Sequence, residues 1–191
     1  MAEADGERRS GEETRDAIRR IALKLFTERG FEGTSIKDIA DALGTTKSAL
    51  YYHFPSKEAI IASLVEDRRA DLDDLLEWVK RQERGPDLLR RAAFRWLDTV
   101  TEERIDGMRF AMANRPAMKR LGGAGEGFRS GIDAVIDVIL EPGAPLEVRL
   151  HARLVFEMLP AVLSVARDSG ATTEQIISIA RDAVRALVGP G

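Results

Sequence analysis

Apolar residues recur at helical intervals over the first third of the chain, and three such stretches predict three short helices. The first stretch has the i, i+3, i+4, i+7 spacing of one helix face, with Ile18, Ile21, Ala22, Leu25 and Phe26. The second stretch has the same spacing, with Ile36, Ile39, Ala40 and Leu43. In the third stretch, Leu50 and Phe54 are the apolar anchors. Facing apolar stripes on three helices predict one small shared core.

Capping and turn residues mark where these helices begin and end. Ser35, with Asp38 three residues later, fits a helix N-cap. Gly44 can end that helix in the left-handed conformation, because glycine has no Cβ atom that would clash with the backbone there. Thr46 can cap the next helix, and Pro55 ends it. Two short helices joined by a glycine turn form a helix-turn-helix, a motif that places its second helix in the major groove of DNA.

A set of polar side chains on this motif has no evident role in folding. These candidates for DNA contact are Lys37, Lys47, Ser48, Tyr51, Tyr52, His53 and Lys57. Lysine can pair with guanine edges or phosphates, and tyrosine and histidine can bond phosphates or pack on thymine methyls. Residues 14–57 carry eight basic and five acidic side chains, a net charge of +3, whereas the whole chain has −3. A three-helix core with a merely solvated polar face is the alternative.

The rest of the chain continues as helices, without the alternation typical of strands. We expect six more helices, over residues 56–82, 88–100, 105–115, 128–140, 146–167 and from 172 onward. The prediction is an all-α protein of about nine helices, with a DNA-binding headpiece at 14–55 and a larger helical ligand-binding and dimerisation domain at 56–191. Residues 1–13 are polar and acidic, so we expect a disordered tail there.

Composition excludes several classes of function. The chain has no cysteine and two histidines, and it contains no HExxH, GxSxG or phosphate-binding loop motif. We therefore expect neither an enzyme nor a metal site nor a cofactor. No apolar run approaches the ~20 residues of a membrane helix, and no signal peptide is recognisable. The expected protein is soluble and cytoplasmic.

The last two helices are apolar on more than one side, which predicts burial on more than one side. One face can pack on the protein's own core and another on a second copy, as a two-fold operator requires. A monomer with a thick core is the alternative. The middle helices carry large adaptable side chains that suit a ligand pocket, although each is equally explained as core: Trp78, Trp96, Met108, Phe110, Met112, Phe128 and Phe156.

The segments ALKLFTERGFEGTSIKDIADALG and ALYYHFPSKEAI resemble the N-terminal domain of the TetR family of transcriptional regulators. The resemblance covers roughly residues 14–62. It implies that the positions of Lys37, Lys47, Ser48, Ala49 and Tyr51 lie near base edges. We expect Thr46, the N-cap of this helix, to contact DNA as well. The resemblance also implies that Ser35, Tyr52, His53 and Lys57 lie near phosphates. Ala49 departs from the small hydroxyl residue often found at its position, which would reduce base contact there to a methyl group.

The resemblance further implies a repressor that binds a palindromic operator as a dimer and is released by a small apolar or amphipathic ligand. The last two long helices would then form a four-helix dimer interface, for which we expect Arg153, Phe156, Leu163, Ile176, Ile179, Ala183 and Leu187. Two alternatives stay open. One is a DNA-binding regulator without a small-molecule ligand, controlled by a protein partner or acting as an activator. The other is a protein–protein module that kept the headpiece fold.

Overall fold

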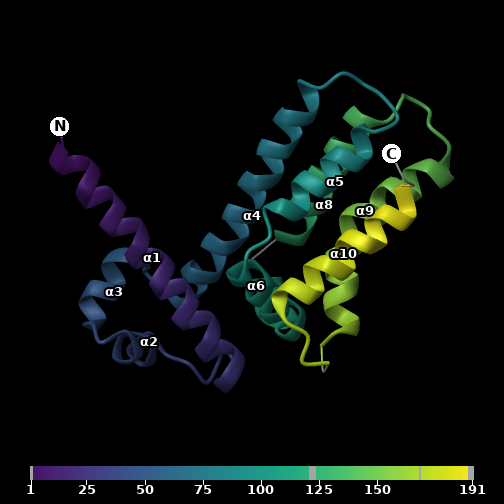
Figure 1. Ribbon diagram of the computed structural model, residues 1–191. Helices are drawn as coiled ribbons and strands as arrows, with labels where there is room; N and C mark the ends of the chain where they lie inside the picture. Colours follow the sequence, from purple (N-terminus) through teal and green to yellow (C-terminus); the bar gives the residue numbers. More distant parts are fainter. Residues whose placement is uncertain (1, 121–123, 168, 189–191) are drawn as a thin grey trace. The chain divides into compact units, whose positions relative to one another are not determined.

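The computed structural model describes residues 2–120, 124–167 and 169–188, and this part of the chain forms ten helices and no strands (Figure 1). The helices are α1 (Ala2–Arg29), α2 (Ile36–Leu43), α3 (Lys47–His53), α4 (Lys57–Lys80), α5 (Leu88–Asp98), α6 (Glu102–Ala113), α7 (Arg115–Arg120), α8 (Ala124–Ile139), α9 (Leu146–Val165) and α10 (Thr173–Val188). The all-α fold expected from the sequence is confirmed. Among the described helices, none is both long and apolar enough to cross a membrane.

The described chain has one helix more than the nine predicted. The helix predicted over residues 105–115 is followed by Pro116, which lies in the first turn of the additional helix α7. Proline is tolerated there because the N–H groups of a first helical turn have no acceptor within the helix. Helix α8 begins at Ala124, inside the glycine-rich run 121–127, of which residues 121–123 lie outside the described residues.

Helix α1 begins at Ala2, so the expected disordered tail over residues 1–13 is corrected for its described part. The tail prediction rested on the absence of apolar residues that could pack. Once residues from Ile18 onward are helical, however, each further residue adds a backbone hydrogen bond without a new nucleation step. Ile18 is the first buried side chain described along α1, so the preceding turns extend beyond the packed core.

The apolar side chains form two cores, in two compact units. The first unit comprises Met1–Glu66 with Asp106–Gly122, and the second comprises Asp67–Ile105 with Gly123–Gly191. Helix α4 contributes Ile60 and Ile61 to the first core and its later residues, such as Leu72 and Leu75, to the second. The boundary between cores therefore falls within α4, further along the chain than the division at residue 55 predicted from Pro55.

In the first unit, α1, α2 and α3 enclose a core that is completed by α6. The rings of Phe26 and Phe31 lie 5.0 Å apart, and Phe110 of α6 lies 5.5 Å from Phe26 and 5.8 Å from Phe31. Phe110 was expected to line a ligand pocket in the larger domain. The structure corrects this expectation, because the ring is 2% exposed and belongs to the core of the first unit.

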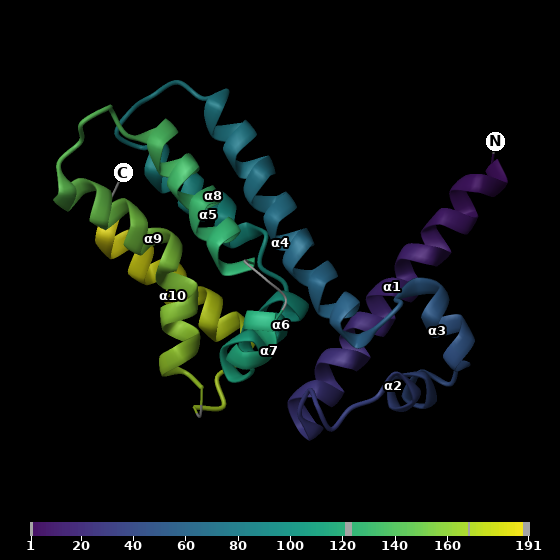
Figure 2. The same ribbon diagram turned by 180° about the vertical axis from the view of Figure 1, so that it is seen from behind.

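In the second unit, α9 and α10 run side by side in both views (Figures 1 and 2). Trp96 of α5 and Phe156 of α9 are among the largest buried side chains of this core. The start of α10 is fixed by a capping box between Thr172 and Gln175. The backbone N–H of Thr172 donates to the Gln175 side chain at 2.9 Å, and the N–H of Gln175 donates to the Thr172 hydroxyl at 3.2 Å.

Two glycines of the first unit should respond to Ala in opposite directions. Gly44 has a φ of 68°, a left-handed conformation, so Gly44→Ala is expected to lower the free energy of unfolding by about 1–2 kcal/mol. Gly107 lies inside α6 with open space around its position, so Gly107→Ala should raise the free energy of unfolding by about 0.5–1 kcal/mol. Urea denaturation followed by circular dichroism measures both. Equal shifts of the two midpoints would contradict the assigned conformation of Gly44.

Candidate nucleic-acid interface

Helix α2 is held at its N-terminus by a reciprocal capping box. The Ser35 hydroxyl accepts from the Asp38 backbone N–H at 3.2 Å, and the Asp38 carboxylate accepts from the Ser35 backbone N–H at 2.8 Å. The carboxylate also accepts from the Ser35 hydroxyl, and these hydrogen bonds lower the pKa of Asp38. Ser35 and Asp38 are therefore occupied in fixing α2, as the sequence predicts.

The turn between the two short helices sets the direction of α3. The backbone N–H of Thr45 donates to the carbonyl of Ala40 at 3.0 Å, which is possible because Gly44 adopts the left-handed conformation. The Thr46 hydroxyl then accepts from the Ala49 N–H at 3.1 Å and caps α3. The turn and both caps confirm the predicted helix-turn-helix.

Helix α3 is anchored on one face and exposed on the other. Leu50 and Phe54 are 0% and 1% exposed. At its C-terminal end, the Arg15 guanidinium donates to the His53 carbonyl at 2.8 Å and lies 4.3 Å from the centre of the Phe54 ring. The sequence prediction missed this role of Arg15. The only signal was a basic residue one turn before Ile18, which does not reveal a partner 38 positions away.

The exposed face of α3 carries the residues predicted to contact DNA. Lys47, Ser48 and Ala49 are exposed at its N-terminal end, and Tyr51 and Tyr52 are 45% and 87% exposed. The Lys47 ammonium lies 5.5 Å from the centre of the Tyr51 ring. A cation beside a phenol on a protruding helix can bond guanine edges, phosphates and the apolar groups of bases.

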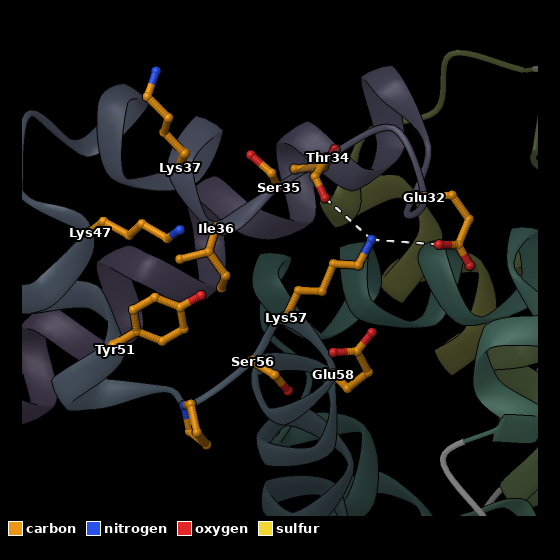
Figure 3. A pocket seen from close by; sticks show the side chains of 11 residues that line it. Glu32, Thr34, Ser35, Ile36, Lys37, Lys47, Tyr51, Ser56, Lys57 and Glu58 are labelled. Atoms are coloured by element: carbon orange, nitrogen blue, oxygen red, sulfur yellow. Dashed lines mark hydrogen bonds and ion pairs between the residues drawn. The ribbon is translucent and has the colours of Figure 1, made fainter.

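A shallow groove of about 390 Å³ runs between α2, α3 and the start of α4. Figure 3 shows Lys47 and Tyr51 extending toward Ile36, whereas Lys37 points away from them. The lining residues are Glu32, Thr34, Ser35, Ile36, Lys37, Lys47, Tyr51, Pro55, Ser56, Lys57 and Glu58. The groove thus brings together five of the predicted DNA contacts, namely Ser35, Lys37, Lys47, Tyr51 and Lys57.

Lys57 is also beside the groove, but its ammonium binds the protein itself. It donates to the carbonyl of Phe31 at 2.6 Å and to that of Thr34 at 3.3 Å, and it lies 3.6 Å from the Glu32 carboxylate (Figure 3). The side chain is 18% exposed. At least two of its three N–H donors are thus used to fix the loop before α2, and the expected phosphate contact of Lys57 stays a prediction.

Lys57→Met is expected to lower the free energy of unfolding by about 1–2 kcal/mol, because the two carbonyls lose a charged donor. Lys80→Met is the matched control, since Lys80 is 48% exposed and forms a surface ion pair with Glu77 at 2.7 Å. The control should change stability by less than about 0.5 kcal/mol. Chemical denaturation of both variants measures the difference, and similar values would refute an internal role for Lys57.

Two further predicted DNA contacts, Lys37 and His53, differ in exposure and in their neighbours. Lys37 has a 74% exposed side chain and forms an ion pair with Asp41 at 3.3 Å, an exposed pair that an incoming phosphate can replace. His53 is half-buried and meets the Tyr52 ring edge-on at 5.2 Å between ring centres. Both residues remain predicted DNA contacts.

The residues predicted for a ligand pocket are divided between the two units. Met108, Phe110 and Met112 fall in the first unit, and Trp78, Trp96, Phe128 and Phe156 fall in the second. In the second unit, the rings of Trp96 and Phe128 lie 5.9 Å apart, and Trp78 lies within 5.7 Å of both Arg91 and Arg95. The seven residues are therefore divided between two units, because spacing along helices does not show which core a helix enters, and the predicted pocket stays a prediction.

The predicted dimer interface needs a similar correction. Phe156, Leu163 and Ile176 are at most 3% exposed, so their side chains fill the protein's own core. Arg153 pairs with Asp133 at 2.6 Å and with Glu157 at 3.1 Å. Ala183 and Leu187 are half-buried, and Ile179 is 50% exposed. Other apolar side chains of α9 face outward instead, namely Leu146, Val148, Leu150, Leu154 and Val165.

Comparison with known proteins gives one family for the headpiece. A family model described as bacterial regulatory proteins, tetR family, matches residues 18–64. The chain is 40% identical over 93 residues to the HTH-type transcriptional repressor KstR2 of Rhodococcus jostii, covering 49% of this chain and 44% of that protein. It is 35% identical over 100 residues to the HTH-type transcriptional regulator AcrR of Shigella flexneri, covering 51% and 46%. The matches thus span less than half the length of these relatives.

Solved structures match over nearly the whole chain. The TetR family transcriptional regulator PfmR of Thermus thermophilus is 26% identical, with a TM-score of 0.65 and coverage of 90% of this chain and 96% of that one. FadR of Bacillus subtilis, solved in complex with stearoyl-CoA, is 15% identical, with a TM-score of 0.62 and coverage of 91% and 97%. At that identity, the second likeness concerns the fold alone.

Proposed function

Because residues 18–64 place this chain in the TetR family of bacterial regulatory proteins, we propose that it is a transcriptional regulator that binds a palindromic DNA operator. The observation that carries this proposal is the outward face of α3, where Lys47 and Tyr51 flank an open groove and have no role in the core. The net charge of +3 over residues 14–57 favours the same surface. The family consists of regulators rather than enzymes, in agreement with the non-enzymatic prediction. A regulator of bacterial operators would act in the cytoplasm.

We further propose that the operator is bound by a homodimer. One recognition helix contacts only a few base pairs, so two copies are needed to read two half-sites of a palindrome. The exposed apolar side chains of α9, together with Ile179 of α10, supply a surface for a second copy. These two helices are also the pair that the family resemblance implies for dimerisation.

Repression relieved by a small apolar or amphipathic ligand is the third part of the proposal. KstR2 of Rhodococcus jostii is a transcriptional repressor, and the Bacillus subtilis FadR structure contains stearoyl-CoA. Helix α4 offers a route for coupling, because one continuous helix contributes to both cores. A ligand that binds one α4 arrangement better than another would shift operator affinity, typically by about 1–3 kcal/mol of coupling free energy.

A regulator without a small-molecule ligand is the second candidate. The observation that favours it is close packing in the second unit, where Trp96 and Phe156 are each 2% exposed. A Cβ atom at Gly131 of α8 would also lie 2.4 Å from a Leu72 methyl group, so the space between α8 and α4 is filled. On this view a protein partner would control the protein, or it would act as an activator.

Selection of the purified protein on random duplex DNA at two salt concentrations tests the proposal. Enrichment of a palindrome, with affinity falling steeply as salt rises, is expected from a dimer that neutralises several phosphates. Absence of any enriched site would favour a protein–protein module instead. The selected operator then allows ligands to be tested by its release. Equal ligand affinity with and without operator would exclude ligand control.

A further inference from the structure

Arg68 of α4 is a nearly buried cation in the second unit. Its side chain is 15% exposed, and its guanidinium carbon lies 3.4 Å from the centre of the Trp96 ring and 6.0 Å from that of Phe128. The guanidinium donates to the Thr99 hydroxyl at 3.0 Å. An arginine stacked on an indole at the edge of an apolar core is held in place, and Thr99 is the one hydrogen-bond acceptor of Arg68 among the described residues.

The Asp71 carboxylate lies near the guanidiniums of both Arg68 and Arg104. Asp71 lies 3.8 Å from Arg68, beyond hydrogen-bonding distance, and 2.5 Å from Arg104. The Asp71 Oδ2 atom nevertheless accepts no hydrogen bond, so its contact with Arg104 is an ion pair of poor geometry. Arg104 also donates to the Thr99 carbonyl. The Asp71 carboxylate therefore lies near two guanidiniums, and its Oδ2 atom accepts a hydrogen bond from neither.

Burial lowers the pKa of Arg68 to about 9, with the Arg104 charge acting in the same direction and Asp71 opposing both. The guanidinium is still charged at neutral pH, although burial of the charged form costs free energy because water is excluded from it. An anion bound beside Arg68 would counter both effects that lower this pKa. Its oxygens would replace the lost hydration of the guanidinium, and its charge would offset that of Arg104. The side chains of Asp71 and Arg104 are 18% and 26% exposed, so the cluster is not sealed from solvent.

We propose that Arg68 and Arg104 form the binding site for the anionic group of a small organic effector, a carboxylate or a phosphate ester with an apolar chain. The planar guanidiniums suit either group through paired hydrogen bonds. Phe128, which is half-buried, supplies apolar surface next to the charge, and the buried Trp96 ring supports the Arg68 guanidinium. Asp71 then serves as an internal competitor that holds Arg104 until the effector arrives. The identification of this anion with the effector rests on the proposed ligand-controlled function, whereas the anion site itself does not.

Isothermal titration calorimetry of the full chain with octanoate, octyl phosphate, octanol and inorganic phosphate tests the site. Octanoate or octyl phosphate should bind saturably and more tightly than octanol by roughly tenfold to a hundredfold, the value of charged hydrogen bonds. Inorganic phosphate should bind more weakly than octyl phosphate, since it lacks the apolar chain. Equal affinity for octanol and both anions, or no saturable binding of either chain-bearing anion, would overturn the proposal.

Two variants distinguish binding from a merely structural ion-pair network. Arg68→Met should lower the affinity for the preferred octyl anion by roughly tenfold or more and leave that for octanol unchanged. Asp71→Asn removes the competitor and should strengthen anion binding, an outcome that keeps the test decisive where Arg68→Met does not fold. Weaker anion binding by Asp71→Asn would count against the site. Operator release is measured separately. Anion binding without release would leave the site intact and refute only the ligand-controlled function.

Discussion

Replacing Lys47 and Tyr51 together by Ala is expected to weaken operator binding by about 2–6 kcal/mol, from about 1–3 kcal/mol for each base-facing contact. Both side chains lie on the exposed face of α3, and neither the Lys47 chain nor the Tyr51 ring is part of the core. The variant should therefore fold normally. Electrophoretic mobility shift or fluorescence anisotropy with the selected operator measures the loss, and circular dichroism verifies the helical content.

Lys80→Ala is the control for the loss of one positive charge, because Lys80 lies in the second unit and pairs only with Glu77 among the interactions described. It should leave the affinity within about threefold, whereas the variant at Lys47 and Tyr51 should also relax sequence preference. An unaltered affinity in the double variant would remove the basis for α3 as the reading helix. It would favour a headpiece that serves protein–protein contacts.

Local signals in the sequence predicted the headpiece well. The capping box of Ser35 and Asp38, the turn at Gly44 and the cap at Thr46 each involve residues within a few positions of one another. Such features depend on short stretches of backbone, so their sequence patterns are specific. The apolar stripe of α1 and the anchors Leu50 and Phe54 were recognisable for the same reason.

Pairings between distant parts of the chain were not recognisable from the sequence. Lys57 binds the Phe31 carbonyl 26 positions away, and Arg15 binds the His53 carbonyl 38 positions away. A lysine or arginine on a helix has the same sequence signature whether its donors meet a phosphate, a carbonyl or water. Phe110 was misassigned similarly, because an aromatic residue in α6 does not reveal which of two cores it enters.

The second unit shows the same limit on a larger scale. The sequence indicated correctly that α9 and α10 are apolar on more than one side, yet it assigned Phe156, Leu163 and Ile176 to the wrong side. A helix with apolar residues around a wide arc has no unique inward direction until its neighbours are placed. The structure resolves the direction: these three side chains face the core, and Leu154 and Ile179 face outward.

Glutamate at those two outward positions is expected to dissociate the proposed dimer. Leu154 and Ile179 are 42% and 50% exposed, so Leu154→Glu with Ile179→Glu should leave each protomer folded. In a two-fold interface every substitution occurs twice, and four carboxylates would be buried without partners. Sedimentation or light scattering at micromolar concentration should then show a monomer. Operator affinity should fall by roughly 10²–10⁴-fold, because the second headpiece no longer binds intramolecularly.

The control for this variant is Leu154→Met with Ile179→Val, which keeps both positions apolar and should stay dimeric with nearly unchanged operator affinity. Its comparison with the glutamate variant separates loss of apolar contact from a general sensitivity of α9 and α10. A glutamate variant that remains dimeric would place the interface on another surface. Because the headpiece residues are identical in both variants, any difference in operator affinity between them measures what the second copy contributes to DNA binding.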